Sequence, residues 1–95
     1  MKLYIAGKIT GNPDFIKQFG QASEILQAEG HTVINPAILP TGFAHDEYMH
    51  ICYSMIDVCD GVALLPNWKE SKGAQMEYAY AVLHEKRIHI LDIAT

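Results

Sequence analysis

The feature that most constrains the fold of this chain is a fourfold alternation of short apolar runs with helix-like segments. The apolar runs are predicted as strands at residues 3–6, 32–34, 61–65 and 87–91. Strands that alternate with helices pair parallel through right-handed crossovers, so the alternation predicts an α/β fold. We expect a flavodoxin-like or Rossmann-like three-layer sandwich with a four-stranded parallel sheet in the order 2-1-3-4.

Three helices are predicted between these strands. The first starts at Asn12-Pro13, with Asn12 as the N-cap and the proline at the first helical position, and it ends at Gly30. Asp46 is expected to cap the second helix, which carries apolar residues on one side. The third helix is predicted from Gly73 to Glu85, after a loop over residues 69–72.

Length and charge limit the class of protein. A chain of 95 residues closes one core, so residues 1–95 are expected to form a single domain. The formal net charge of −4 has the wrong sign for a dedicated nucleic-acid binder. The expected partner is therefore a small molecule or a protein, and not a nucleic acid.

The cysteines and histidines give no pattern of a metal site or a disulfide framework. Cys52 and Cys59 form no CxxC pair, and His45 and His50 are five residues apart, which does not place them on one helical face. The apolar run before Gly7 is too short for a signal peptide or a membrane span. We expect a cytoplasmic protein without a metal, a cofactor or membrane contact.

Ligands of open parallel sheets bind beyond the carboxyl ends of the strands, at the switch point of the strand order. Here that point lies between the first and third strands, next to the loop 7–11. Its sequence is neither GxGxxG nor a P-loop, because the spacing of its glycines differs. Two interpretations stay open: a turn that needs two glycines, or a binding loop that uses Gly7, Lys8, Thr10 and Gly11.

Glu77 is the most informative single residue, because the helix around it is apolar on nearly every side. A carboxylate inside such a helix needs a reason to be there. Helical side chains lean toward the N-terminus, so Glu77 is expected to point at the segment 71–73 and the carboxyl edge of the sheet. The alternatives are a functional carboxylate in the crevice and an ordinary glutamate on an exposed seam.

Five segments together resemble the nucleoside 2-deoxyribosyltransferase superfamily, which includes the 2'-deoxynucleoside 5'-phosphate N-hydrolases. They are most similar to its short bacterial and phage branch. The segments, in chain order, are Tyr4–Gly11, Val33–Ala37, Cys59–Val62, Leu64–Trp68 and Ser71–Ala79. The last is the most specific, because its glutamate falls at the family's nucleophile position.

This resemblance implies a covalent mechanism. The carboxylate of Glu77 would attack the anomeric carbon of a nucleoside or nucleotide and displace the base, as in a retaining glycosidase. Water would then complete a hydrolysis, or a second base a deoxyribosyl transfer. A nucleophile must be ionised, and a nearby helix N-terminus and the hydroxyl of Tyr4 are expected to favour that state.

Tyr4 is the second predicted catalytic residue, because it matches the family's strand-one tyrosine. Ser71 matches a serine that contacts phosphate or sugar, although a helix N-cap is its ordinary interpretation. The complete set of predicted substrate-binding residues is Gly7, Lys8, Thr10, Gly11, Cys52, Asn67, Trp68, Ser71 and Gly73. Because Lys8 and Lys72 flank the carboxyl edge of the sheet, we also hypothesise that the ligand carries phosphate.

Three departures from the family pattern support an alternative function. Cys52 stands where active members carry an aspartate, and a loss of proton transfer there could cost about 10²–10⁴ in rate. Lys8 and Thr10 replace a serine and an arginine of the first loop. The sequence stops at Thr95, so it is expected to lend little to a neighbouring subunit's site. The alternative is a catalytically weak or inactive nucleotide-binding module that senses or sequesters its ligand.

A homodimer is expected as well. A core of this size gains from burial at an interface, and the helix with Met49, Tyr53 and Met55 has more apolar residues than one face needs. The resemblance also implies sites close to a two-fold interface. A flavodoxin-like electron carrier is a poorer interpretation, because the first loop lacks the Ser/Thr-rich phosphate-binding sequence.

Overall fold

The four apolar runs form one parallel sheet in the computed structural model, which describes residues 1–92. Its strands are β1 (Lys2–Ala6), β2 (Thr32–Ile34), β3 (Gly61–Leu64) and β4 (Arg87–Ile90). They lie in the order β2-β1-β3-β4, and each neighbouring pair is parallel. The predicted strand order is therefore confirmed. The expectation about Thr95 lies outside the described residues.

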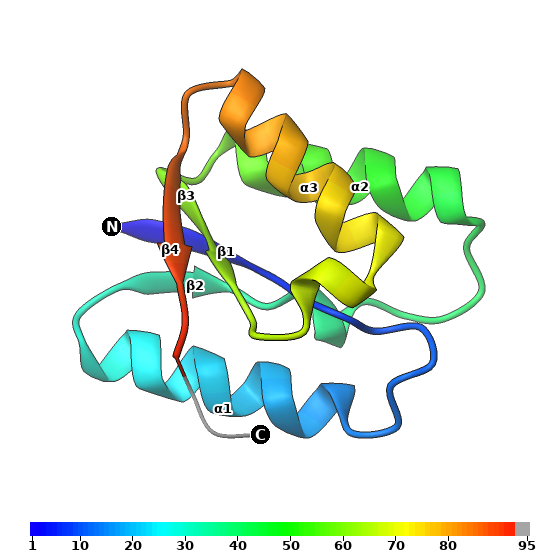
Figure 1. The fold of residues 1–95 in the computed structure, drawn as a ribbon, viewed down its shortest axis with the longest axis horizontal. Coiled ribbons are helices and arrows are strands. Elements are labelled where there is room, and N and C mark those ends of the chain that lie inside the picture. The colour runs from blue at the N-terminus through cyan, green and yellow to red at the C-terminus, as the bar shows by residue number, and fades with distance from the viewer. Residues whose placement is uncertain (93–95) are drawn as a thin grey trace.

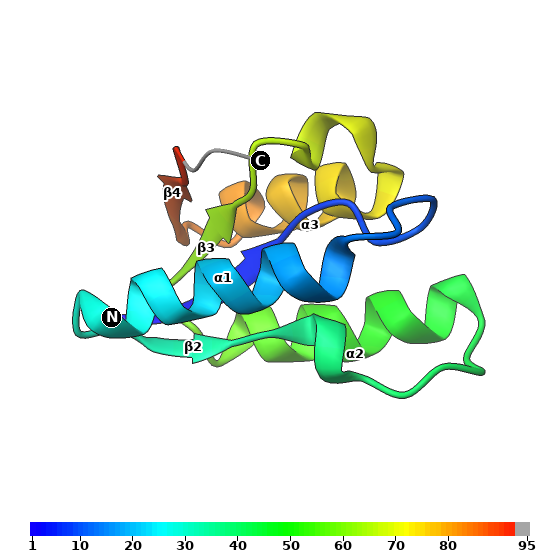
Figure 2. The ribbon, with the colours of Figure 1, turned by 90° about the horizontal axis from the view of Figure 1, so that it is seen from below.

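Helices cover both faces of the sheet, as a three-layer sandwich requires. Helix α1 (Phe15–Ala28) lies on one face, and α2 (His45–Asp57) and α3 (Lys72–Leu83) lie on the other (Figures 1 and 2). Two short 3-10 helices, η1 (Pro36–Ile38) and η2 (Trp68–Glu70), follow the carboxyl ends of β2 and β3. The fold class predicted from the alternation is confirmed.

The central strand β1 is buried on both faces, and its side chains alternate between two cores. Leu3 and Ile5 pack with α1, whereas Tyr4 and Ala6 pack with α2 and α3. Each large apolar side chain buried in this way contributes about 1.5–3 kcal/mol to folding. Tyr4 is only 1% exposed, so its hydroxyl has to find a polar partner inside the protein.

The predicted start of the first helix is wrong, because α1 begins at Phe15 and not at Asn12-Pro13. The side chain of Asn12 instead closes the preceding turn. Its amide donates hydrogen bonds to the carbonyl of Lys8 at 2.9 Å and to Gln18 at 2.8 Å, and its oxygen accepts one from the backbone of Asp14. An asparagine side chain that bonds to nearby backbone competes with helix formation, which explains the later start.

Three further predictions, all for segments after β2, need correction. Asp46 does not cap α2: Ala44 is the N-cap, and its backbone N–H donates to the carboxylate of Glu47 at 2.8 Å. The predicted loop 69–72 is partly ordered as η2. In addition, Met49 is buried and does not contribute to an exposed apolar surface on α2.

Gly7, directly after β1, lies too close to Leu65 for a residue with a side chain. A Cβ atom at this position would lie 2.5 Å from Cδ1 and 2.9 Å from Cβ of Leu65, closer than real atoms approach. We expect Gly7→Ala to lower the free energy of unfolding by about 1–3 kcal/mol, because overpacking strains a dense core. Urea denaturation measures this effect. The control is Gly20→Ala in α1, where a Cβ would meet nothing within 4 Å, and equal stability changes in both variants would contradict the explanation.

Candidate active site

A cavity of about 690 Å³ opens at the carboxyl edge of the sheet. Its walls come from β1 and the loop after it, the start of α1, the segment after β2, and the first turns of α2 and α3. This is where a ligand of an open parallel sheet is expected. The volume falls in the range of about 300–1,000 Å³ that is typical of small-molecule sites.

Glu77 and Tyr4 meet at the inner wall of this cavity. The hydroxyl of Tyr4 donates a hydrogen bond to Oε2 of Glu77 at 2.5 Å, across 73 residues of sequence. Glu77 is 7% exposed, and it is the one charged side chain among residues 1–92 that is classed as buried. The prediction that Glu77 lies in the crevice within reach of Tyr4 is confirmed, and the exposed-seam alternative is wrong.

Burial controls the charge of Glu77. Loss of solvation raises the pKa of its carboxyl group from 4.5 to about 7, although hydrogen bonds from Tyr4 and Cys52 lower it. Glu77 lies in the second turn of α3, beyond the first turn where a helix N-terminus acts most strongly. The Tyr4 hydroxyl therefore favours the ionised state as expected, but desolvation outweighs it.

The other two groups in contact with Glu77 are neutral. Desolvation raises the pKa of the Cys52 thiol to about 12. Burial, followed by the neighbouring Glu77, raises the pKa of the Tyr4 hydroxyl well above its ordinary value of 10.0. Both groups keep their protons at neutral pH, so Glu77 is the one member of this trio that can carry charge.

Seven of the eleven predicted site residues line the cavity. Two of them, Tyr4 and Glu77, form the buried pair described above. The others are Gly7, Thr10, Cys52, Ser71 and Gly73. Ser71 has its ordinary role as well, because its hydroxyl caps α3 by accepting a hydrogen bond from the backbone N–H of Ala74 at 3.1 Å.

Three other predicted residues line a separate, smaller pocket: Lys8, Gly11 and Asn67. The ammonium of Lys8 lies 3.7 Å from the carboxylate of Glu70, and its backbone N–H donates to the side chain of Asn67 at 3.1 Å. Gly11 has a φ of +76°, a left-handed backbone conformation that glycine adopts in tight turns without steric cost. The turn interpretation of the first loop therefore holds for Gly11, and Lys8 does not face the cavity.

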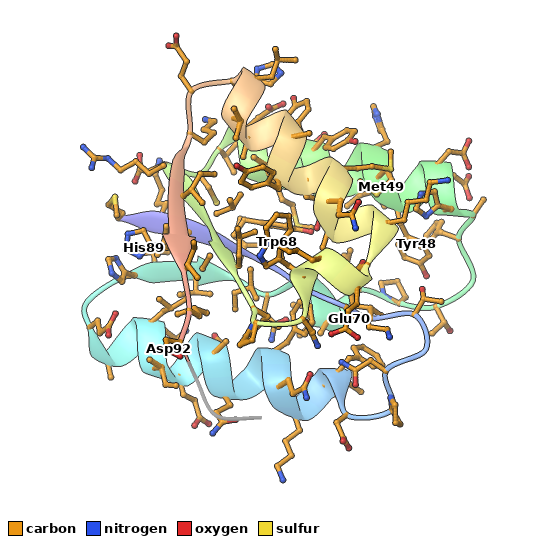
Figure 3. The ribbon with its side chains drawn as sticks, viewed as in Figure 1. Tyr48, Met49, Trp68, Glu70, His89 and Asp92 are labelled. Carbon is orange, nitrogen blue, oxygen red and sulfur yellow. The ribbon has the colours of Figure 1, made fainter. Side chains whose placement is uncertain are left out.

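Trp68 lines neither pocket. Its ring packs against Tyr78 with centroids 4.8 Å apart, and it covers the core between the sheet and α3. Figure 3 shows Trp68 well apart from Tyr48 and Met49, which line the cavity. This packing covers part of the apolar surface of the indole, which favours its position away from the crevice.

The sequence analysis missed a row of cavity residues on α2. His45, Tyr48 and Met49 line the same cavity as Cys52. Their spacing of three, four and seven residues from Cys52 places them on one face of the helix. That spacing is the signal in the sequence that places these three side chains beside Cys52.

Two structural features are absent from residues 1–92. No helix in this part of the chain is long and apolar enough to cross a membrane. Within the same residues, no group of three His, Cys, Asp or Glu side chains could hold a metal ion.

Two solved structures share this fold. A 2-desoxiribosyltransferase from Leishmania mexicana superposes with a TM-score of 0.74 at 17% identity, over 99% of this chain and 65% of that protein. A 2-deoxyribosyltransferase from Bacillus psychrosaccharolyticus gives a TM-score of 0.66 at 20% identity, over 100% of this chain and 77% of that protein. At these identities the similarity establishes the fold, which is that of the 2-deoxyribosyltransferases.

Sequence comparison gives the family. No curated protein matches the sequence of this chain. A family model described as a domain of unknown function, DUF4406, matches residues 1–91, almost the entire chain. The chain therefore belongs to the DUF4406 family, and its fold is that of the 2-deoxyribosyltransferases.

Proposed function

We propose that this protein cleaves the N-glycosidic bond of a nucleoside or nucleotide, with Glu77 as the nucleophile. The observation that carries the proposal is the buried Tyr4–Glu77 pair on the wall of a ligand-sized cavity. A carboxyl group with its pKa raised to about 7, placed in a cavity, is typical of a functional site. The shared fold with two 2-deoxyribosyltransferases supports the same chemistry.

The chemistry follows from the position of the carboxylate. Ionised Glu77 attacks the anomeric carbon, the bond to the base breaks, and a glycosyl ester forms on Glu77. Tyr4 keeps the carboxylate oriented through its hydrogen bond. Attack by water on the ester completes a hydrolysis, whereas attack by a second base completes a deoxyribosyl transfer.

The test is a panel of nucleosides and their 5'-monophosphates, incubated with the protein and analysed for free base. Release of base from at least one compound is the expected result. A second incubation with a different free base separates the two outcomes, because a transferase forms a new nucleoside. Binding without any base release would contradict the proposal.

A binding module without catalysis is the second candidate function. The specific observation in its favour is the Cys52 thiol, which stands beside Glu77 with a pKa of about 12 and cannot replace a carboxylate in proton transfer. Such a protein would sense or sequester a nucleotide. It would show saturable binding in calorimetry and no turnover in the base-release assay.

Tyr4→Phe tests the role of the hydroxyl. A hydrogen bond to a charged group contributes about 1.5–3 kcal/mol, so its loss raises the pKa of Glu77 by at least about one unit. We expect base release at pH 7 to fall about fivefold or more and to recover toward pH 9. Tyr80→Phe is the control, because its hydroxyl contacts Asp57 on the exposed surface. An equal loss at pH 7 and pH 9 would contradict this explanation.

A homodimer and a cytoplasmic location belong to the same proposal. Apolar side chains remain exposed at the C-terminal ends of α2 and α3, where Val58 is 60% and Leu83 is 78% exposed. A second copy packed on this surface would remove them from water. The two unpaired cysteines are consistent with a reducing compartment.

A further inference from the structure

The proposed reaction has an unmet need for a proton. A base that leaves with the electron pair of the glycosidic bond leaves faster when an acid protonates it. The two protic groups beside Glu77 are poor acids, because burial raises the pKa of Cys52 to about 12 and that of Tyr4 well above 10. The proton donor has to come from elsewhere in the cavity.

Other protic side chains of the cavity are engaged or unsuited. The hydroxyl of Tyr48 donates to the carbonyl of Pro40 at 2.6 Å. Glu70 is exposed at the rim and faces the ammonium of Lys8. Lys72 lines the cavity, but an ammonium group is by nature a much weaker acid than an imidazolium ion. The aliphatic hydroxyls of Thr10, Thr41 and Ser71 also line the cavity, but aliphatic alcohols are very weak acids.

His45 is the remaining candidate, and its position fits the task. It is the first residue of α2 and lines the cavity. Its ring packs beside the start of α3, where Cε1 lies 3.9 Å from the position that a Cβ of Gly73 would occupy. Within residues 1–92, hydrogen bonds and ion pairs of histidine rings involve His31 alone, so the ring of His45 is free to meet a ligand.

The spacing along α2 places His45 and the nucleophile at different parts of the cavity. His45 precedes Cys52 by seven residues, which is two helical turns, or about 10 Å, along the same face. Cys52 and Glu77 line the same cavity. A nucleoside between Glu77 and His45 would present its anomeric carbon to the carboxylate and its base to the imidazole.

We propose that His45 is the general acid of the reaction and protonates the departing base. This inference rests on the proposed cleavage of an N-glycosidic bond. As the bond from Glu77 to the anomeric carbon forms, the carbon–nitrogen bond breaks, and the base nitrogen takes the proton of the imidazolium. Neutral His45 then removes a proton from the attacking water or second base, and the ester bond breaks to restore the carboxylate.

The experiment uses leaving groups that differ in their need for a proton. The probes are 2'-deoxyguanosine, its 5'-monophosphate and the 7-methyl derivatives of both, whose cationic base leaves without protonation. With protein in excess over probe, so that only the first, base-releasing step is followed, His45→Gln is expected to slow base release from the unmethylated probes by about 10²–10⁴-fold and to leave release from the 7-methyl probes unchanged. The matched control is His50→Gln, on the same helix but outside the cavity.

Each outcome has a separate meaning. Equal slowing of methylated and unmethylated probes by His45→Gln would overturn the assignment, because a residue that only shapes the cavity affects both. The same loss in His50→Gln would overturn it as well. If the wild-type protein releases base from none of the four probes and from no compound of the nucleoside and 5'-monophosphate panel, the proposed function fails and this inference fails with it. If the wild-type protein releases base from the probes, and His45→Gln releases it from all of them at the wild-type rate, only the inference fails.

Discussion

Glu77→Gln is expected to lower the rate of base release by about 10⁴-fold or more, while nucleotide affinity is largely retained. The amide keeps the shape of the side chain and an oxygen that accepts the hydrogen bond from Tyr4, which lies at 2.5 Å in the wild-type protein. It removes the charge that forms the bond to the anomeric carbon. Base release measured by chromatography and affinity measured by calorimetry test the two halves of this prediction.

The control for this variant is Glu70→Gln, which neutralises a carboxylate at the rim of the same cavity. It should leave the rate of base release close to that of the wild type, because the side chain of Glu70 is 67% exposed and its carboxylate pairs with the ammonium of Lys8. A similar loss of turnover in both variants would indicate a general effect of charge and would contradict a nucleophilic role. Unchanged turnover in Glu77→Gln would exclude Glu77 from the chemistry.

The second large effect is on stability. In the folded protein the pKa of Glu77 is about 7, against an ordinary value of 4.5, so the folded state holds this proton more tightly than the unfolded state. The associated stabilisation is fully present below about pH 4.5 and is lost as the pH rises through 7. A shift of this size corresponds to about 3 kcal/mol in the free energy of unfolding between pH 4.5 and pH 8.

Glu77→Gln cannot make this contribution, because an amide does not titrate in this range. The free energy of unfolding of the wild type minus that of the variant should therefore fall by about 3 kcal/mol from pH 4.5 to pH 8. Urea denaturation of both proteins at a series of pH values measures the difference. Other titrating groups, such as Asp60, are common to the two proteins and cancel. Parallel profiles would contradict the raised pKa.

Together these predictions describe a site that carries a cost in stability. Above neutral pH an ionised carboxylate remains in a desolvated position, which is unfavourable for the fold. The same carboxylate is the group that can form a covalent bond to a sugar. Loss of activity accompanied by a gain in stability at pH 8 in Glu77→Gln would be the signature of this trade-off.

The sequence by itself determined the order of the sheet and the location of the site. Alternation of apolar runs and helical segments is a local pattern, and right-handed crossovers leave few topologies for four parallel strands. The apolar surroundings of Glu77 on its helical wheel indicated a buried carboxylate for the same reason, because helical periodicity is local. The boundaries near Asn12 and Asp46 were wrong where side chains bonded to nearby backbone in ways that propensity does not describe.

Only the tertiary structure decided which side chains meet in the cavity and what charge they carry. The Tyr4–Glu77 hydrogen bond joins residues 73 positions apart, and Lys8, which pairs with Glu70, lines a separate pocket. His45 entered the site because α2 packs beside the first turn of α3. Desolvation and side-chain contact depend on atoms brought together from several elements, so no local pattern in the sequence contains them.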